Sequence, residues 1–309
     1  HCMKIFRSFS EAKGIRNPVV TTGSFDGVHI GHKTILNRLK KLARKYDGES
    51  VLVTFEPHPR KVLYPDTIGK NLRLITSGEE KLELLKQAGL DNVIIVEFTK
   101  DFSRITSEEF VRDFLHGILN VKVIVAGFNH HFGFNKEGDY KHLWNWRTKY
   151  NFEAEEIPEQ EVQNETVSST KIRQAIKDGY IQRANAYLDH YYIVMGKPRY
   201  SGYENSSYPI KMYEVPVEDD SKLLPAPGIY AVSAESGPVQ ARCMAVISVD
   251  ENDKPELLLH LIEKDYLPYD QTSVISFHKK IHGAVNLADH KTSGVKLKAA
   301  KNEISELIY

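Results

Sequence analysis

The chain has 309 residues, of which 41% are hydrophobic and 27% charged, a composition typical of a globular protein with about two domains. Basic and acidic residues are balanced at 41 each, which excludes the overall positive charge typical of nucleic-acid-binding proteins. No apolar run approaches the roughly 20 residues that cross a bilayer. We therefore expect neither a nucleic-acid nor a membrane partner.

The cysteine content is low. Cys2 and Cys243 lie far apart and lack the spacing of a metal site. This usage fits a reducing compartment, and with no signal peptide visible we expect a cytoplasmic protein. Nothing in the composition fixes an oligomeric state.

The first strong pattern is a strand, a glycine-rich turn and a helix. The β-branched and apolar run Val19 to Thr22 predicts a buried strand. Gly23, Gly27 and Gly31 follow, and residues 33–43 carry apolar side chains at helical spacing. This arrangement directs unpaired N–H groups and the positive end of a helix dipole at a ligand, which favours phosphate. Basic residues on the helix either serve an anionic small molecule or face solvent.

The turn lacks both the glycine pattern of dinucleotide-binding loops and the lysine of a P-loop. It contains instead a His-x-Gly-His string, His29 to His32, at the mouth of the helix. Two imidazoles at this spacing can reach one phosphate chain, and Gly31 leaves room for close approach. Asp26 is expected to support the turn. A glycine loop with two surface histidines is the alternative.

The string resembles the HxGH signature of nucleotidylyltransferases. The longer run GSFDGVHIGH, residues 23–32, resembles the adenylyltransferase module of prokaryotic bifunctional FAD synthetases, which combine riboflavin kinase and FMN adenylyltransferase. The resemblance implies that ATP and FMN are substrates and that Mg²⁺ is the cofactor. It also implies that Gly23, Phe25, Gly31 and His32 bind ATP and that His29 and His32 are catalytic.

The next strand, Ser50 to Phe55, leads into the loop Glu56-Pro57-His58-Pro59-Arg60. Loops at the carboxyl ends of parallel strands bind ligands in α/β proteins, and two prolines stiffen this one. The loop is either a rigid connection or a ligand site. The string TFEPHP resembles the flavin-side loop of the same family, which implies FMN binding by Pro57, His58, Pro59 and Arg60.

A helix over residues 77–89, a strand over 93–96 and a capped helix over 110–119 follow. The first of these helices is interpreted as packing. In the resembled family the segment around Phe98, Phe102 and Phe110 lies near the isoalloxazine ring. From the sequence alone these aromatics are interpreted first as core.

A fourth strand, Val121 to Gly127, ends in a glycine- and aromatic-rich loop. Adjacent histidines, His130 and His131, seldom converge on one ion, so we expect no protein metal site. The loop resembles the ATP-contacting element of the family, which implies ATP binding by Gly127 and Asn129, with Asn129 also catalytic. Asn129 is expected to orient a phosphate or a magnesium-bound water. A helix around 143–146 and an outer strand over 153–157 follow.

The run Val167 to Arg173 opens a helix predicted over 171–178, stopped by Gly179. Serine and threonine at a helix start are ordinary caps. Together with a guanidinium they also form a helix end that can grip polyphosphate. The run resembles the ISSTxIR motif of the family, which implies ATP binding by Ser168, Ser169, Thr170 and Arg173, with Arg173 also catalytic.

From residue 189 short strands separated by turns predict a small antiparallel barrel, followed by a helix over 293–308. Order and length resemble the riboflavin kinase domain of the family. We therefore expect an α/β chain with a Rossmann-like domain over 1–188, built on a parallel sheet with helices on both faces. A kinase-like antiparallel β-barrel follows over 189–309.

The residues that the resembled kinase domain uses for catalysis are absent from the corresponding positions of this sequence. The GFPTAN string of an active domain, whose Thr and Asn hold magnesium and nucleotide, is replaced here by residues 205–212, NSSYPIKM. Leu258 stands where the catalytic glutamate belongs, and leucine cannot accept a proton. We therefore expect FMN adenylyl transfer without riboflavin phosphorylation. The alternatives are retained kinase activity, nucleotidyl transfer to another phosphate such as phosphopantetheine, and a catalytically silent flavin-binding or regulatory protein.

Overall fold

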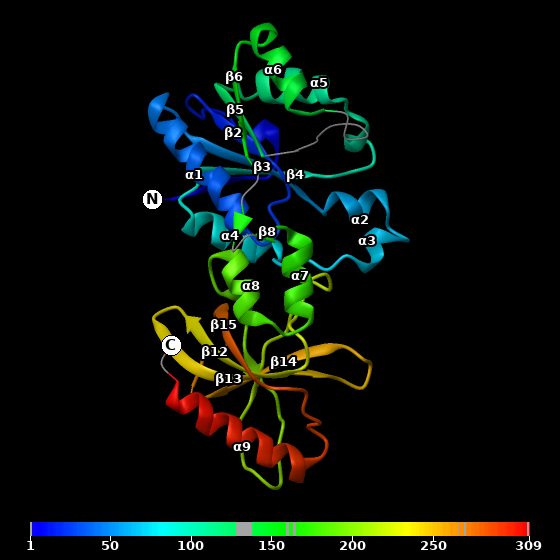
Figure 1. The fold of residues 1–309 in the computed structure, drawn as a ribbon, viewed down its shortest axis with the longest axis vertical. Coiled ribbons are helices and arrows are strands. Elements are labelled where there is room, and N and C mark those ends of the chain that lie inside the picture. Colours follow the sequence, from blue (N-terminus) through cyan, green and yellow to red (C-terminus); the bar gives the residue numbers. More distant parts are fainter. Residues whose placement is uncertain are drawn as a thin grey trace. The chain divides into compact units, whose positions relative to one another are not determined.

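The computed structural model describes residues 2–127, 138–158, 161–162, 165–264, 266–268, 270–307 and 309. The chain divides into two compact units, His1–Leu72 with Lys81–Val167, and Arg73–Glu80 with Ser168–Tyr309. Each unit contains its own large sheet (Figure 1). The functional domain boundary after residue 188 stays a prediction.

The first unit contains a parallel sheet of six strands among the described residues, in the order β1-β4-β3-β2-β5-β6. Every neighbouring pair is parallel. The central strands are buried along nearly their whole length, as expected for strands covered on both faces. The strands are β1 (Lys4–Phe6), β2 (Val19–Thr22), β3 (Ser50–Glu56), β4 (Asn92–Glu97), β5 (Val123–Gly127) and β6 (Glu153–Ile157).

Helices cover both faces of this sheet, which confirms the predicted Rossmann-like architecture. One face, which includes Val20, packs against Val111 and Leu115 of the π-helical segment η3. On the other, α1 buries Leu36 and Leu39 and runs across β2, β3 and β5. The helical segments are η1 (Phe9–Glu11), α1 (Ile30–Lys45), α2 (Pro59–Leu63), α3 (Ile68–Asn71), α4 (Gly78–Gln87), η2 (Phe102–Arg104), α5 (Ser107–Glu109), η3 (Phe110–His116) and α6 (Tyr140–Lys149).

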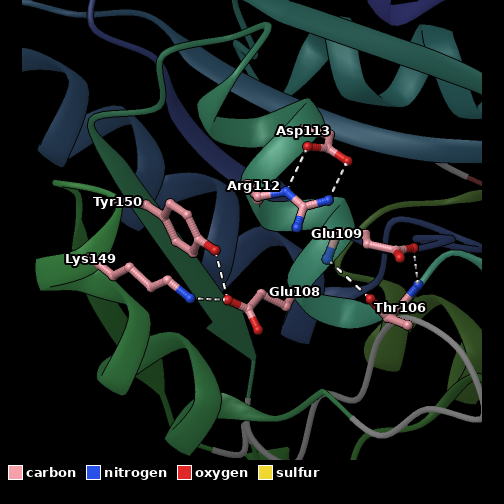
Figure 2. A network of polar contacts seen from close by, with 7 residues as sticks. All are labelled: Thr106, Glu108, Glu109, Arg112, Asp113, Lys149 and Tyr150. Carbon is pink, nitrogen blue, oxygen red and sulfur yellow. Dashed lines mark hydrogen bonds and ion pairs between the residues drawn. The ribbon is translucent and has the colours of Figure 1, made fainter.

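A network of polar contacts ties α5 to the end of α6 (Figure 2). Thr106 and Glu109 form the predicted capping box at the start of α5. Glu108 accepts hydrogen bonds from Lys149 Nζ at 2.5 Å and from Tyr150 Oη at 2.7 Å. The helix predicted over residues 110–119 is present as η3. It directly follows α5, is π-helical and ends at His116.

The second unit contains an antiparallel sheet in the order β10-β11-β14-β13-β12-β15-β9. Its edge strands β9 and β10 are joined by only two residues, Lys197 and Pro198, so the sheet must curl until its edges approach. The predicted barrel-like curl is confirmed. The elements are β9 (Tyr192–Gly196), β10 (Arg199–Tyr200), β11 (Tyr213–Glu214), β12 (Gly228–Ser236), β13 (Val239–Val249), β14 (Pro255–Leu261) and β15 (Ser273–His282).

Three helices complete this unit: α7 (Ser169–Lys177), α8 (Ile181–Leu188) and α9 (His290–Glu306). Leu297, Ala300 and Ile304 of α9 pack into a core with Met244 and Val246 of β13. Figure 1 shows α9 beside the strands of this sheet. A short hairpin, β7 (Glu161–Val162) with β8 (Glu165–Thr166), lies in the chain before α7. Among the described helices none has the length and apolar character needed to span a membrane.

Candidate active site

The His-x-Gly-His string lies where the strand order of the parallel sheet reverses. From β2 the chain adds β3 and then β4 on one side, whereas β5 lies on the other side of β2. Ligands of open α/β sheets bind at the carboxyl ends of the strands beside such a switch point. Gly23 directly follows β2 and Gly127 ends β5, so both flank this position. A Cβ at Gly127 would lie 3.1 Å from Ile35 of α1.

The turn after β2 has an unusual backbone. Positive φ angles occur at Gly23 (158°), Phe25 (49°), Gly27 (87°) and Val28 (44°). Phe25 and Val28 are nevertheless 4% and 0% exposed. Burial of the two apolar side chains offsets the strain of this backbone, which fixes one conformation of the turn at the mouth of α1.

His29 and His32 cap the helix with their own rings. The backbone N–H groups of Gly31 and His32 donate to Nδ1 of His29 at 3.1 and 3.4 Å. The backbone N–H of His29 donates to Nδ1 of His32 at 3.2 Å. Because each Nδ1 accepts, each ring holds its proton on Nε2. The expectation of unpaired N–H groups was wrong at Gly31 and His32, since imidazole caps them.

The two imidazoles form a stack with Phe25. The ring centroids of His29 and His32 are 3.5 Å apart at an interplanar angle of 16°, and those of Phe25 and His32 are 4.4 Å apart at 13°. Burial lowers the pKa of His32 well below its ordinary value, and the charges of His29 and Lys81 lower it further. His32 is therefore a neutral hydrogen-bond donor at physiological pH.

Lys81 of α4 lies against this turn and was missed by the sequence analysis, which interpreted its helix as packing. Its side chain is nearly buried, and Nζ donates to the carbonyl of Ser24 and to Oγ1 of Thr54, each at 3.0 Å. The available signal was helical spacing: Lys81 precedes Leu84 and Leu85 by three and four residues and so shares their buried face.

The proposed flavin loop follows β3. The Glu56–Pro57 peptide bond is cis. Pro59 and Arg60 do not lie in a loop but open the short helix α2, because proline is favoured in a first helical turn and His58 caps it. The backbone N–H of Arg60 donates to Nδ1 of His58 at 3.1 Å. His58 is thus a helix cap as well as a candidate ligand.

The aromatic residues beside this loop are only partly core. Phe110 is 5% exposed, which confirms the core interpretation for that ring. Phe98 and Phe102 are half-buried and contact Phe55 edge-on or tilted, with ring centroids 5.9 Å apart in both pairs. The carboxyl ends of β3 and β4 therefore present an accessible aromatic surface.

The second predicted phosphate-binding group opens α7 in the second unit. Ser168 is the N-cap, and its Oγ accepts from the backbone N–H of Lys171 at 3.2 Å, so the ordinary capping interpretation is correct for this hydroxyl. Ser169 and Thr170 lie in the first turn and Arg173 is half-buried one turn later.

The first unit contains Gly23, Phe25, His29, Gly31, His32, Gly127 and the segment from Pro57 to Arg60. The second unit contains the other predicted phosphate-binding residues, Ser168, Ser169, Thr170 and Arg173. That these residues converge with the imidazoles on one triphosphate stays a prediction. Asn129 and the adjacent histidines lie outside the described residues. Within the described part of the chain, no three His, Cys, Asp or Glu side chains form a metal-binding group.

Comparison with known proteins places this chain among flavin-synthesising enzymes. Residues 12–171 match the FAD synthetase family. A bifunctional riboflavin kinase/FMN adenylyltransferase of Listeria monocytogenes is 30% identical over 270 residues, covering 86% of this chain and 81% of the relative. The chain belongs to the FAD synthetase family.

Other comparisons agree with this assignment. Family members of the same name from Escherichia coli K12 and Pseudomonas fluorescens are 30% and 28% identical, and the matches cover 67% and 85% of their lengths. A crystal structure described as a macrolide-efflux protein of Streptococcus pneumoniae superposes with a TM-score of 0.84 at 24% identity, covering 99% of both chains. That likeness shows the fold alone.

The position that the sequence analysis assigned to a kinase glutamate, Leu258, lies in the core of the second unit. Leu258 is 4% exposed and packs into the core with Met244 and Val246. Asn205 is also buried, and its amide nitrogen donates to Tyr203 Oη at 3.0 Å and to Ser293 Oγ at 2.9 Å. The side chain of Leu258 thus packs in the core, and that of Asn205 forms internal hydrogen bonds.

Proposed function

We propose that this member of the FAD synthetase family is an FMN adenylyltransferase, which makes FAD and pyrophosphate from FMN and ATP. The observation that carries the proposal is the stacked pair His29 and His32. Both rings are fixed with the proton on Nε2, at the mouth of a helix beside the switch point of a parallel sheet. N–H donors there suit a triphosphate.

The reaction is a direct displacement. An oxygen of the FMN phosphate attacks the α-phosphorus of ATP in line, the new P–O bond forms, and the bond to the bridging oxygen breaks. Pyrophosphate leaves with the electron pair of that bond. No covalent enzyme intermediate is needed, so the residues of the chain position the reactants and stabilise charge.

His29 and His32 would donate from Nε2 to phosphate oxygens, and His32 would stabilise the charge that develops on the transferring group. Ser168, Ser169, Thr170 and Arg173 would hold the β- and γ-phosphates that leave. Pro57, His58, Pro59 and Arg60 would flank FMN, beside the half-buried aromatic rings at the ends of β3 and β4.

Magnesium would depend mainly on the substrate for its ligands. Phosphate oxygens and water are common ligands of Mg²⁺ in nucleotide-binding proteins. When bound, Mg²⁺ would neutralise charge on the triphosphate. Asn129, outside the described residues, would orient ATP or a magnesium-bound water.

We further propose that the kinase-like sheet lacks riboflavin kinase activity. Leu258 replaces the expected proton acceptor and is buried in the core, so a neighbouring carboxylate would have to take its place from another position. The second unit then serves packing, flavin binding or regulation.

The test is incubation of the purified protein with FMN, ATP and Mg²⁺, with FAD followed by chromatography and pyrophosphate by a coupled assay. Stoichiometric FAD and pyrophosphate are expected. Binding of FMN without turnover would instead support a silent flavin-binding protein. Pyrophosphate release with another phosphate, such as phosphopantetheine, but not with FMN would overturn the choice of substrate.

A further inference from the structure

A buried ammonium group supports the turn that precedes the catalytic helix. Lys81 is 8% exposed, and its Nζ donates to the carbonyl of Ser24 and to Oγ1 of Thr54. Ser24 lies in the turn after β2, whereas Thr54 lies near the carboxyl end of β3. Lys81 therefore joins the turn to a rigid strand.

The contact continues to the imidazoles through adjacent residues. Ser24 is followed by Phe25, whose backbone is in the left-handed region with φ 49° and whose ring stacks on His32. His32 in turn stacks on His29. A shift of the Ser24 carbonyl would move Phe25, and with it the surface against which both imidazoles rest.

Two carboxylates partly offset the cost of burying the Lys81 ammonium group. Desolvation lowers its pKa, whereas the carboxylates of Glu56 and Asp26 act in the opposite direction. Leu84 and Leu85 already bury the same face of α4, so packing alone does not require a lysine here. Burying an ammonium group is costly, which points to a role for its charge and its donors.

We propose that Lys81 is a positioning residue for adenylyl transfer, which holds the carbonyl of Ser24 against β3 and thereby sets Phe25 and the imidazole pair. The expected effect on kcat rests on the proposed adenylyltransferase function. The charge of Lys81 also helps to keep His32 neutral, and the other titratable group acting on His32 is His29.

The principal test compares Lys81→Met with Lys86→Met, a substitution at an exposed position of the same helix. Lys81→Met should lower kcat by about 10-fold or more, with KM for ATP and FMN changed less than about threefold, because misplacement acts in the transition state. Lys86→Met should retain wild-type values. Circular dichroism establishes that both variants are folded.

A second readout does not depend on turnover. The ring proton of His32, followed by NMR against pH, should titrate at higher pH in Lys81→Met, because one nearby positive charge is lost. If Lys81→Met does not fold, Thr54→Val replaces it, since this change removes one acceptor and keeps the charge. Thr54→Val should lower kcat by about 3- to 10-fold.

Wild-type kcat in the folded variant would overturn the proposal. A fall in kcat of folded Lys81→Met with an unchanged His32 titration would also overturn it, because Lys81 would then not act on the imidazole pair. Failure of the adenylyltransferase proposal looks different: the wild-type protein itself would make no FAD, while the NMR titration would still show whether Lys81 acts on His32.

Discussion

Each imidazole of the His-x-Gly-His string uses its two ring nitrogens for different tasks. Nδ1 accepts a backbone N–H and caps α1, so the proton of the neutral ring lies on Nε2. A cap of this kind fixes tautomer and ring orientation together, so the donors need no reorganisation when phosphate arrives. The side-chain oxygen of asparagine could replace Nδ1 as the helix cap, but the amide N–H groups would not lie where the imidazole places Nε2–H.

We expect His32→Ala to lower kcat for FAD formation by about 100-fold or more, because one donor to the developing charge is lost. His29→Asn should also lower kcat while it preserves thermal stability, since asparagine is a good N-cap. Steady-state kinetics and thermal unfolding of both variants check this. His116→Asn is the control at a histidine outside the site, and near-wild-type turnover of His32→Ala would contradict the role.

Stability should depend on pH through His32. Its pKa is lowered in the folded protein from the ordinary value of 6.5, so between the two values the unfolded chain binds the extra proton. The free energy of unfolding should therefore fall as pH drops below about 6.5, by at most about 1.4 kcal/mol per pH unit for this group. Urea unfolding at several pH values measures the slope, which should become shallower in His32→Asn.

At the scale of elements, short segments are held in place by buried polar contacts. The segment Arg73–Glu80, which includes the first residues of α4, belongs to the second unit, and there Glu80 pairs with Lys222 at 2.6 Å with side chains 1% and 0% exposed. Lys222 Nζ also donates to the carbonyls of Ile75 and Ile193, at 2.6 and 2.7 Å. The backbone N–H of Met195 donates to Glu80 at 2.8 Å.

We expect Lys222→Met to reduce the free energy of unfolding by about 3–5 kcal/mol, because it leaves the carboxylate of Glu80 buried without its cation. The double variant Lys222→Met with Glu80→Gln should recover part of this loss, since glutamine is neutral and keeps an acceptor for Met195. Urea unfolding provides the measurement.

The matched control is an exposed ion pair in the network of Figure 2. Arg112 and Asp113 are joined at 2.8 Å, yet their side chains are 50% and 53% exposed. Solvent screening makes such a pair worth about 0–1 kcal/mol, so Arg112→Ala should change stability little. If Lys222→Met and Arg112→Ala lowered the free energy of unfolding equally, the expected effect of burial would be contradicted.

At the scale of the whole molecule, the proposal assigns one activity to the chain and denies it a second. We expect the protein to make FAD from FMN but no FMN from riboflavin, ATP and Mg²⁺, because Leu258 is an apolar core residue. Chromatography of both reactions checks this, and FAD formation by the same preparation shows that the protein is active. Robust phosphorylation of riboflavin would show that another carboxylate replaces the missing glutamate.

The sequence by itself determined most of the architecture. Apolar runs such as Val19 to Thr22 predicted the parallel strands, and regular short strands predicted the curled antiparallel sheet. Local patterns succeed here because the hydrophobic pattern of a strand and the residues that cap a helix are neighbours in the chain. The His-x-Gly-His string likewise predicted the helix that follows the turn, whereas its role as an active site stays a prediction.

Only the tertiary structure decided how that site is built. It showed that His29 and His32 cap their own helix and stack on Phe25, and that Lys81 of α4 holds Ser24. The charge and hydrogen bonds of a group depend on residues distant in the chain, and no local periodicity reports them. A lysine at helical spacing could therefore be predicted to face the core, but its partner could not.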